Sequence, residues 1–242
     1  MTMDGSFQFD VEEDTWLAKW LHQPAYKLSL SKSDRGQVLG SYSQPGFYYS
    51  KISSSRTRCV EYLVRNNFVI ASLDVTLELI SPKIHKAAEN SRAKVTAAQP
   101  FMKETIAEIA SNCFAQDRFH QDPAIENGVA DQIKSEWVKN YFDGRRGTHM
   151  FVAKIKDQIV GFILLIVADA TATIDLIGVQ KKFHGQGVGR ALIDEGIRQI
   201  ESRQWIVGTQ ANNYASLSLY HALGFKVVDG NCSMHAHMKT GF

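Results

Sequence analysis

The stretch of this sequence best suited to chemistry is a glycine-rich turn at residues 184–189, which reads HGQGVG. The apolar, branched run at residues 173–179 predicts a buried strand before the turn. Apolar residues at helical spacing from Val188 to Ile200 predict a helix after it. The first amides of a helix lack intrahelical partners, and the helix dipole favours negative charge there. Because glycines also let a ligand approach the backbone, we expect the turn to bind a phosphate or pyrophosphate.

Two familiar phosphate-binding motifs do not fit this turn. A Walker P-loop needs Lys and then Ser or Thr after its last glycine, whereas Gly189 is followed by Arg190-Ala191. A dinucleotide-binding fingerprint has G-x-G-x-x-G spacing early in a βαβ unit, whereas this turn has G-x-G-x-G spacing and comes late in the chain. The remaining alternative is a strand–helix connection that binds no ligand.

A second motif lies downstream, where Asn213 is followed at fixed spacing by Tyr220 and Gly224-Phe225. Together the two motifs resemble the signatures of the GNAT family of N-acetyltransferases. Those signatures read Arg/Gln-x-x-Gly-x-Gly/Ala and, later, Asn followed by Tyr-x-x-x-Gly-Phe. His184 departs from the pattern, because the family usually has Arg or Gln at that position. The resemblance implies acetyl-CoA as the co-substrate and a primary amine as the acceptor of the acetyl group.

The resemblance also implies a role for each part of the motifs. The amides of Gln186 to Arg190 would hold the cofactor pyrophosphate, and a backbone N–H at Val179 or a neighbour would stabilise the thioester oxygen. Tyr220 would be the catalytic general acid that protonates the leaving thiolate. The expected cofactor-binding residues are Ile177, Gly178, Val179, His184, Gly185, Gln186, Gly187, Val188, Gly189, Arg190, Asn213 and Tyr220.

Each role has a structural alternative. Tyr220 alone would be read as a packed aromatic residue, and Asn213 as the N-cap of its helix, a role it can combine with cofactor binding. His184 fits a surface loop as well as a phosphate contact. His235 and His237 share one face of a predicted terminal strand, but without a third ligand they predict a structural role and no metal site.

The acceptor side carries weaker signals. Arg118, Phe119 and His120 lie in a polar loop after the first predicted GNAT helix, where acceptors often bind in this family, and Arg suits a diphosphate. Asp175, in the central strand, is a candidate base, with water as the alternative. Residues 113–119 and the helix around Trp137 are similar to GNAT enzymes that acetylate an amino-deoxysugar carried on dTDP. We therefore expect the amine of a nucleotide-linked deoxysugar as the acceptor.

Two alternatives to this function stay open. One is a GNAT enzyme that acts on a peptide or another small amine, and the other is an acyl-CoA-binding protein without catalysis. The intact Tyr220 argues against the second. A homodimer is compatible with either alternative.

The order of predicted elements indicates an α/β (α+β) GNAT fold, a mixed, mostly antiparallel sheet flanked by helices. We expect the catalytic domain at residues 91–242 and a smaller, degenerate GNAT-like half-domain at residues 1–90. The predicted helices and strands of the catalytic domain span residues 101–114, 129–142, 150–155, 159–168, 173–179, 188–200, 205–209, 213–223, 225–228 and 232–238. The last two strands are expected to form a hairpin.

The half-domain is predicted from a helix–turn–strand pattern that occurs twice in the sequence. A predicted helix at residues 58–63 ends at Asn66-Asn67, and a strand follows from Phe68. Aligning Phe68 with Phe225 places Asn67 on Gly224. Chance is the alternative, because a helix that ends at Asn before an apolar strand is common.

Composition and charge limit the partners, the membrane association and the cellular compartment that we expect for this chain. The 242 residues carry a net charge of +2 and no basic stripe, which argues against a nucleic-acid partner. The longest apolar run, residues 159–168, is strand-sized, so we expect no membrane span. The first 14 residues are acidic and are expected to form a solvated arm without signal-peptide features. Three widely spaced cysteines predict free thiols in a reducing cytoplasm.

Overall fold

The computed structural model describes residues 7–31, 37–38, 44–82 and 92–239. Contacts divide the chain into two compact units. The first unit comprises residues 1–75, 116–129 and 229–242, and the second comprises residues 76–115 and 130–228. Both units combine stretches that are far apart in the sequence, and the boundary expected near residue 90 stays a prediction.

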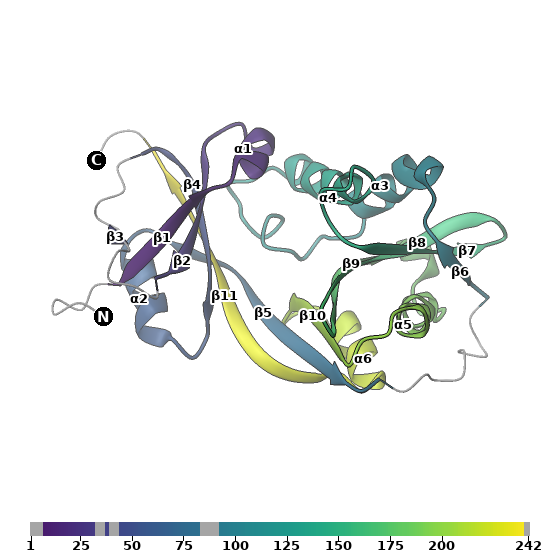
Figure 1. Cartoon of the computed structure of the whole chain (residues 1–242). Helices are drawn as coiled ribbons and strands as arrows, with labels where there is room; N and C mark the ends of the chain where they lie inside the picture. Colours follow the sequence, from purple (N-terminus) through teal and green to yellow (C-terminus); the bar gives the residue numbers. More distant parts are fainter. Residues whose placement is uncertain (1–6, 32–36, 39–43, 83–91, 240–242) are drawn as a thin grey trace. The chain divides into compact units, whose positions relative to one another are not determined.

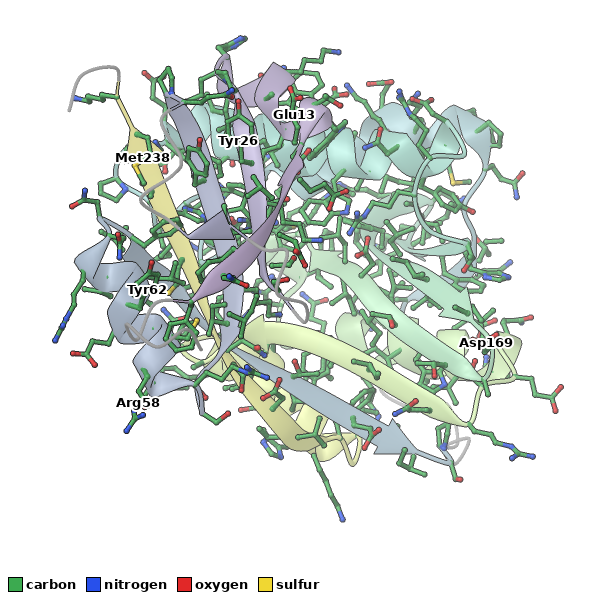
Figure 2. The ribbon with its side chains drawn as sticks, turned by 60° about the vertical axis from the view of Figure 1, so that its left-hand side comes forward. Glu13, Tyr26, Arg58, Tyr62, Asp169 and Met238 are labelled. Atoms are coloured by element: carbon green, nitrogen blue, oxygen red, sulfur yellow. The ribbon has the colours of Figure 1, made fainter. Side chains whose placement is uncertain are left out.

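The first unit contains a sheet in which the strands follow the order β3-β1-β2-β4-β11-β5 (Figure 1). The strands are β1 (Gln8–Glu13), β2 (Ala25–Leu30), β3 (Gln37–Val38), β4 (Gly46–Ser53) and parts of β5 (Val69–Ile80) and β11 (Lys226–Met238). The helices are α1 (Thr15–Leu21) and α2 (Thr57–Arg65). β2 and β4 pair in parallel, whereas β1 pairs antiparallel with β2 and β3. Glu13 and Tyr26, labelled in Figure 2, lie opposite each other in the β1–β2 ladder.

The expectation of a solvated arm over residues 1–14 is wrong for its described part. Residues 8–13 form β1, and the Phe9 side chain is fully buried in the core of the first unit beside Leu28 and Tyr48. Phe7, Phe9 and Val11 alternate with polar residues here. In the sequence alone, this short alternation beside four carboxylates favours a solvated segment rather than a half-buried strand.

The expected hairpin at the carboxy-terminal end is also wrong, because β11 is one strand from Lys226 to Met238. Asp229-Gly230-Asn231 has the composition of a turn. Instead, the Gly230 carbonyl accepts a hydrogen bond from the Ser54 amide at 2.8 Å. A Cβ on residue 230 would lie 3.0 Å from the Ser54 hydroxyl. The glycine is therefore needed because two segments of the chain approach closely at Gly230, and it does not form a turn.

The second unit contains a sheet in which the strands follow the order β5-β10-β9-β8-β7-β6. The additional strands are β6 (Lys94–Ala97), β7 (His149–Ile155), β8 (Gln158–Ala168), β9 (Thr171–Val179) and β10 (Gln204–Gln210). The helices are η2 (Pro100–Met102), α3 (Lys103–Ser111), α4 (Asn127–Phe142), η3 (Lys181–Phe183), α5 (Val188–Gln199) and α6 (Tyr214–Ala222). From β6 to β9 the pairing is antiparallel, and β10 pairs in parallel with β9.

Helices cover both faces of the sheet in the second unit. α3 and α4 lie on one side of β7–β9 and α5 lies on the other (Figure 1). Ile106 and Ala110 of α3 pack against Phe162 and Leu176 in an apolar core. In the described ranges, no helix is long and apolar enough to cross a membrane.

The structure confirms that α2 and α6 end in the same helix–turn–strand pattern. In α6, the amide of Phe225 donates to the carbonyl of Tyr220 and the amide of Gly224 to that of His221, which is the Schellman motif. In α2, the amide of Phe68 donates to Leu63 and the amide of Asn67 to Val64 in the same pattern. Asn67 has a φ of 65°, as an αL residue at a helix end requires. That the amino-terminal third derives from a GNAT half-domain stays a prediction.

Residues 116–129 belong to the first unit, although the helices before and after them lie largely in the second. The Arg118 guanidinium stacks on the rings of Tyr49 and Phe119, at 4.3 and 4.2 Å. Its Nη1 lies 3.1 Å from Nε2 of His235. Because arginine only donates, His235 accepts at Nε2 and carries its proton at Nδ1.

The buried carboxylate of Asp122 completes this network. Nδ1 of His235 donates to it at 2.7 Å, and Nε2 of His237 lies 2.9 Å away. Burial raises the pKa of Asp122, but the hydrogen bonds from the two histidines outweigh it and hold that pKa below its usual range. Burial lowers the pKa of His235, so the imidazole stays neutral in the folded chain. The network ties residues 116–129 to β4 and β11.

We expect the chain to lose stability on mild acidification, and His235 to cause part of that loss. Below a pH of about 6.5 an unfolded histidine binds a proton that the folded His235 does not, so unfolding is favoured as the pH falls. His235→Asn keeps a donor for Asp122 but removes the acceptor for Arg118. It should lower the free energy of unfolding at neutral pH by about 1–3 kcal/mol.

Urea titrations near neutral pH and at a pH of about 5.5 test this expectation, because the interval spans the titration of an unfolded histidine. The variant should lose less stability over this interval than the unsubstituted chain. His221→Asn, at an exposed position of α6, is the control and should leave both values unchanged. An undiminished pH dependence in His235→Asn would show that His235 does not cause it.

Candidate active site in the second unit

The site begins where the pairing between β9 and β10 stops. The parallel ladder ends at Ile174 and Val207, although β9 continues to Val179 and β10 to Gln210. In the described part of the chain, residues 175–179 therefore have no ladder partner on the β10 side. Their outward amides are available to a ligand that lies along this edge, whereas the Val179 carbonyl is bound by two side chains.

A β-bulge lies at the same point on the opposite edge of β9. Leu164 of β8 faces Leu176, and Leu165 faces Ile174, so Asp175 has no partner of its own. Bulges bend a strand, re-aim a side chain and are frequent beside active sites. The bulge thus separates the fully paired half of β9 from the half with an open edge.

The predicted glycine turn is confirmed as a left-handed turn that leads into a helix. Gly185 and Gly187 both have a φ of 73°, a conformation that side chains with a Cβ rarely adopt. Gly187 is the N-cap of α5 and offers no capping side chain. The amides of Val188, Gly189 and Arg190 thus lack both an intrahelical acceptor and a side-chain cap, which fits an anionic ligand.

Two side chains bind the last carbonyl of β9. Nε2 of His184 lies 2.8 Å from the Val179 oxygen, and the Cys113 thiol donates to it at 3.3 Å. Because a carbonyl only accepts, His184 carries a proton at Nε2. His184 therefore ties the turn back to the strand, a structural role, and its predicted phosphate contact stays a prediction. No motif or spacing indicates the Cys113 contact, which joins two distant segments.

Close packing explains two glycines of the motif region. A Cβ on Gly178 would lie 2.9 Å from Cε1 of Phe162 and 3.3 Å from Cβ of Cys113. A Cβ on Gly189 would lie 3.0 Å from Leu219 of α6. The first glycine lets the end of α3 approach β9, and the second lets α5 approach α6.

Tyr220 lies in the last turn of α6, where the Schellman motif fixes it. Its ring packs against Phe225 at 5.6 Å, and the side chain is only 2% exposed. Burial raises the pKa of Tyr220 well above its ordinary value, so the phenol keeps its proton at neutral pH. A protonated phenol in an apolar setting suits a proton donor, which is compatible with the predicted role.

Asn213 caps the amino end of the same helix. Its side-chain oxygen accepts from the Ser216 amide at 3.3 Å, and Nδ2 donates to the Thr209 hydroxyl at 3.2 Å. The N-cap role is thus present, and its contact with a cofactor stays a prediction.

Asp175 is held by a set of donors at the bulge. Arg146 binds it with two hydrogen bonds of 2.7 Å, and the Trp137 indole donates at 3.1 Å. Burial raises the pKa of Asp175, whereas Arg146 and, more weakly, Lys134 lower it, and the net direction is upward. Neither Arg146 nor Trp137 is marked as a partner of Asp175 by any sequence motif, since the contacts join α4, the loop before β7, and β9.

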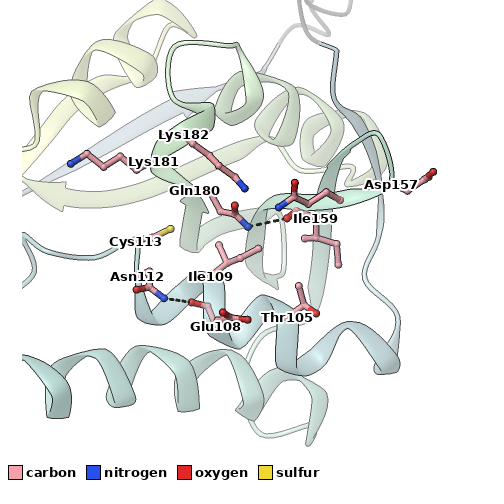
Figure 3. Close-up of a pocket in the computed structure, with 11 residues that line it drawn as sticks. Thr105, Glu108, Ile109, Asn112, Cys113, Asp157, Ile159, Gln180, Lys181 and Lys182 are labelled. Atoms are coloured by element: carbon pink, nitrogen blue, oxygen red, sulfur yellow. Dashed lines mark hydrogen bonds between the residues drawn. The ribbon is translucent and has the colours of Figure 1, made fainter.

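A pocket of about 750 Å³ lies beside this site, between α3, the β7–β8 turn and the end of β9 (Figure 3). Cys113 and Gln180 line it, together with Lys181 and Lys182 of η3. Lys182 points into the pocket, whereas Asp157 points away from it (Figure 3). Gln180 is fixed by donation to the Ile159 carbonyl at 3.1 Å. The pocket thus presents a cation close to the glycine turn.

The predicted acceptor residues fall in different units. Arg118, Phe119 and His120 belong to the first unit, where Phe119 is 1% exposed and His120 bonds Asp117 at 2.8 Å. Asp175 belongs to the second unit. The acceptor role of all four residues stays a prediction.

Comparison with known proteins points to one family. Residues 106–225 match the sequence profile described as "Acetyltransferase (GNAT) family". Over 130 residues the chain is 31% identical to the spore coat polysaccharide biosynthesis protein SpsD of Bacillus subtilis (strain 168), a stretch that covers 52% of this chain and 45% of SpsD. Over 94 residues it is 30% identical to a ribosomal protein bS18-alanine N-acetyltransferase of Salmonella typhimurium, covering 37% of this chain and 64% of that enzyme.

The chain thus spans less than two thirds of the length of these curated relatives. A solved structure of a GCN5-related N-acetyltransferase from Sphaerobacter thermophilus aligns with 97% of this chain and 77% of its own, with a TM-score of 0.62 and 15% identity. These matches confirm the predicted fold class.

We expect Gly178→Ala to destabilise the second unit by about 1–3 kcal/mol, because the added methyl must displace Phe162 in the core. Gly208→Ala is the matched control, since Gly208 lies in the adjacent strand β10 and no atom lies within 4 Å of the place that its added methyl would take. The control should change stability by no more than about 0.5 kcal/mol. Chemical denaturation of the two variants measures the difference, and equal stabilities would contradict the packing role of Gly178.

Proposed function

Because residues 106–225 of this chain are a domain of the GNAT acetyltransferase family, we infer that the chain transfers the acetyl group of acetyl-CoA to a primary amine. One observation carries the proposal. The β9–β10 ladder ends at Ile174, and the strand then runs through its open edge into a glycine turn and the uncapped start of α5. This arrangement offers backbone donors first to a pantetheine-like amide chain and then to a pyrophosphate.

Acetyl-CoA supplies an activated thioester. The residues of this chain bind it and donate or accept the protons that the reaction transfers. Ile177, Gly178 and Val179 contact the pantetheine arm, and an N–H in this stretch stabilises the charge that develops on the thioester oxygen. The amides of Gln186 to Arg190 hold the pyrophosphate, and Asn213 contacts the cofactor from α6. The lysines of η3 add positive charge beside the turn.

Proton transfers are assigned to two residues of the second unit. Tyr220 keeps its proton at neutral pH and gives it to the leaving thiolate as the C–S bond breaks. Asp175 takes the proton that the acceptor ammonium must lose before its nitrogen can attack. The alternative for this second step is water.

The preferred acceptor is the amino group of a nucleotide-linked deoxysugar. Two likenesses support this choice. Residues 113–119 resemble TDP-fucosamine acetyltransferase, and SpsD, a relative at 31% identity, is named for polysaccharide biosynthesis. Arg118, Phe119 and His120 would contact this acceptor, and a cationic guanidinium suits its diphosphate. The chain acts without a metal, in the cytoplasm, and a homodimer is compatible with this proposal.

A peptide amine is the second candidate acceptor. The relative from Salmonella typhimurium is named for acetylation of an alanine of a ribosomal protein. This candidate would use the same thioester chemistry and differ only in the acceptor contacts.

We expect Tyr220→Phe to lower kcat by at least about 100-fold on the best acceptor, because the proton donor for the thiolate is lost. The assay follows CoA thiol release with dTDP-linked amino sugars, a peptide with amino-terminal alanine, and simple amines. Tyr214→Phe is the matched control, since Tyr214 lies in the same helix and is 75% exposed.

Four outcomes of that assay are decisive. Turnover of a dTDP-amino sugar above the other amines supports the proposed acceptor, whereas preference for the peptide supports the second candidate. Wild-type kcat in Tyr220→Phe would remove Tyr220 from its role. Tight acetyl-CoA binding without turnover of any amine would favour a non-catalytic acyl-CoA-binding protein.

We expect Lys182→Ala to weaken acetyl-CoA binding about fivefold, the effect of losing ~1 kcal/mol from one exposed charge contact. Lys94→Ala, at an exposed position of β6, is the control and should bind like the unsubstituted chain. Calorimetric titration with acetyl-CoA measures both. Equal affinities of the two variants would place the anionic part of acetyl-CoA away from the η3 lysines.

A further inference from the structure

The surroundings of Asp175 differ from those of an ordinary surface ion pair. The carboxylate is 9% exposed, and both of its oxygens are hydrogen-bonded. Oδ2 accepts from Nε of Arg146 and from the Trp137 indole, whereas Oδ1 accepts, among the residues that the structure describes, only from Nη2 of Arg146. Since each carboxylate oxygen has two acceptor sites, one site on Oδ1 remains for another donor.

The two side chains that donate to Asp175 form a rigid frame. The Arg146 guanidinium lies 4.1 Å from the centroid of the Trp137 ring, so the two groups that bind Asp175 also stack on each other. Lys134 of α4 lies 4.7 Å from the same ring and is itself buried. We call Arg146, Trp137 and Asp175 the Asp175 clamp. A planar guanidinium held by two bonds and an aromatic face fixes the orientation of the carboxylate.

The clamp lies at a special point of the sheet. Asp175 occupies the bulge in β9, one residue after the last pair of the β9–β10 ladder. Ile177 to Val179, assigned above to the thioester, follow on the same strand, and residues in a strand advance about 3.3 Å each. Asp175 thus lies about 10 Å from Gly178 along the strand. An acceptor amine that approaches the thioester from the side of the bulge would lie between the two residues, and its proton could reach Oδ1 directly or through one water.

We propose that Arg146 and Trp137 are positioning residues that hold Asp175 as the base for the acceptor amine. The inference rests on the proposed function. In this step an N–H bond of the acceptor ammonium breaks, the proton passes to Oδ1 of Asp175 directly or through one water, and the neutral amine keeps the electron pair with which it attacks the thioester. Arg146 opposes the rise in the pKa of Asp175 that burial causes, and Trp137 fixes which oxygen faces the acceptor.

Charge explains why Arg146 is needed. Burial alone drives the pKa of Asp175 upward, and the cations that oppose this shift are Arg146 and Lys134. Without Arg146 the carboxyl would be protonated over more of the neutral range and could not accept a proton. Removing an opposite charge at this distance should raise the pKa of Asp175 by about one unit or more.

The test uses the full chain and two readouts. The Trp137 indole N–H donates to Asp175, so its NMR resonance should titrate with that carboxyl in the absence of any substrate, and Trp137→Phe assigns it. Arg146→Met should move the midpoint of this titration upward by about one pH unit or more. The acidic limb of the pH profile of kcat should also move to higher pH. The loss of activity in Arg146→Met should therefore be larger at acidic than at alkaline pH.

Arg145→Met is the matched control, because Arg145 is the neighbouring residue, is 64% exposed and pairs with Asp143. It should leave both readouts unchanged. Arg146→Lys should keep the pH limb near its normal position and lower kcat, since charge remains but the two-bond contact does not. Asp175→Asn should abolish the indole titration and the acidic limb together.

An unmoved indole midpoint in Arg146→Met, or an unmoved acidic limb in an active Arg146→Met enzyme, would overturn the inference while leaving the acetyltransferase activity in place. If the unsubstituted chain turns over no amine, the proposed function fails and the catalytic part of the inference fails with it. The indole titration then shows whether the clamp acts on Asp175 at all.

Discussion

The end of hydrogen bonding between β9 and β10 is the constraint on which the second unit depends. Every backbone amide and carbonyl needs a partner, and a strand edge in the middle of a sheet normally finds one on its neighbour. In the part of the chain that the structure describes, no neighbour pairs with β9 on this side beyond Ile174 and Val207, so the outward amides of residues 175–179 are left for another partner. The glycine turn and the uncapped start of α5 continue the row of donors. A cofactor with amide groups and a pyrophosphate would complete these hydrogen bonds.

The remaining elements keep this edge in place. β8 supports the other side of β9 as far as Val179, and the Val179 carbonyl is held by His184 and Cys113. The absence of a side chain at Gly178 brings α3 close to the strand. At the end of α6, the Schellman motif holds Tyr220 in an apolar setting that keeps it protonated. The candidate acid, the candidate base and the backbone donors are thus all placed by the ends or irregularities of regular elements.

Features encoded by short stretches of sequence could be predicted, and those encoded by distant contacts could not. The turn at residues 184–189, the Asn213 cap and the αL residue Asn67 follow from local backbone chemistry. The strand at Phe9, the continuity of β11 through Gly230 and the bulge at Asp175 depend on partners far away in the chain. For the same reason the sequence could suggest Asp175 as a base but could not identify Arg146 and Trp137 as its partners.

Amide hydrogen exchange with and without CoA would show whether the open edge of β9 binds the cofactor, because it reports on individual backbone groups of the intact chain. Saturating CoA should slow exchange at the outward amides of residues 175–179 and at Val188, Gly189 and Arg190, with little change in the fully paired half of β9. Unchanged exchange in both segments, with CoA binding established by calorimetry, would contradict the claim that the open edge and the start of α5 form the cofactor site.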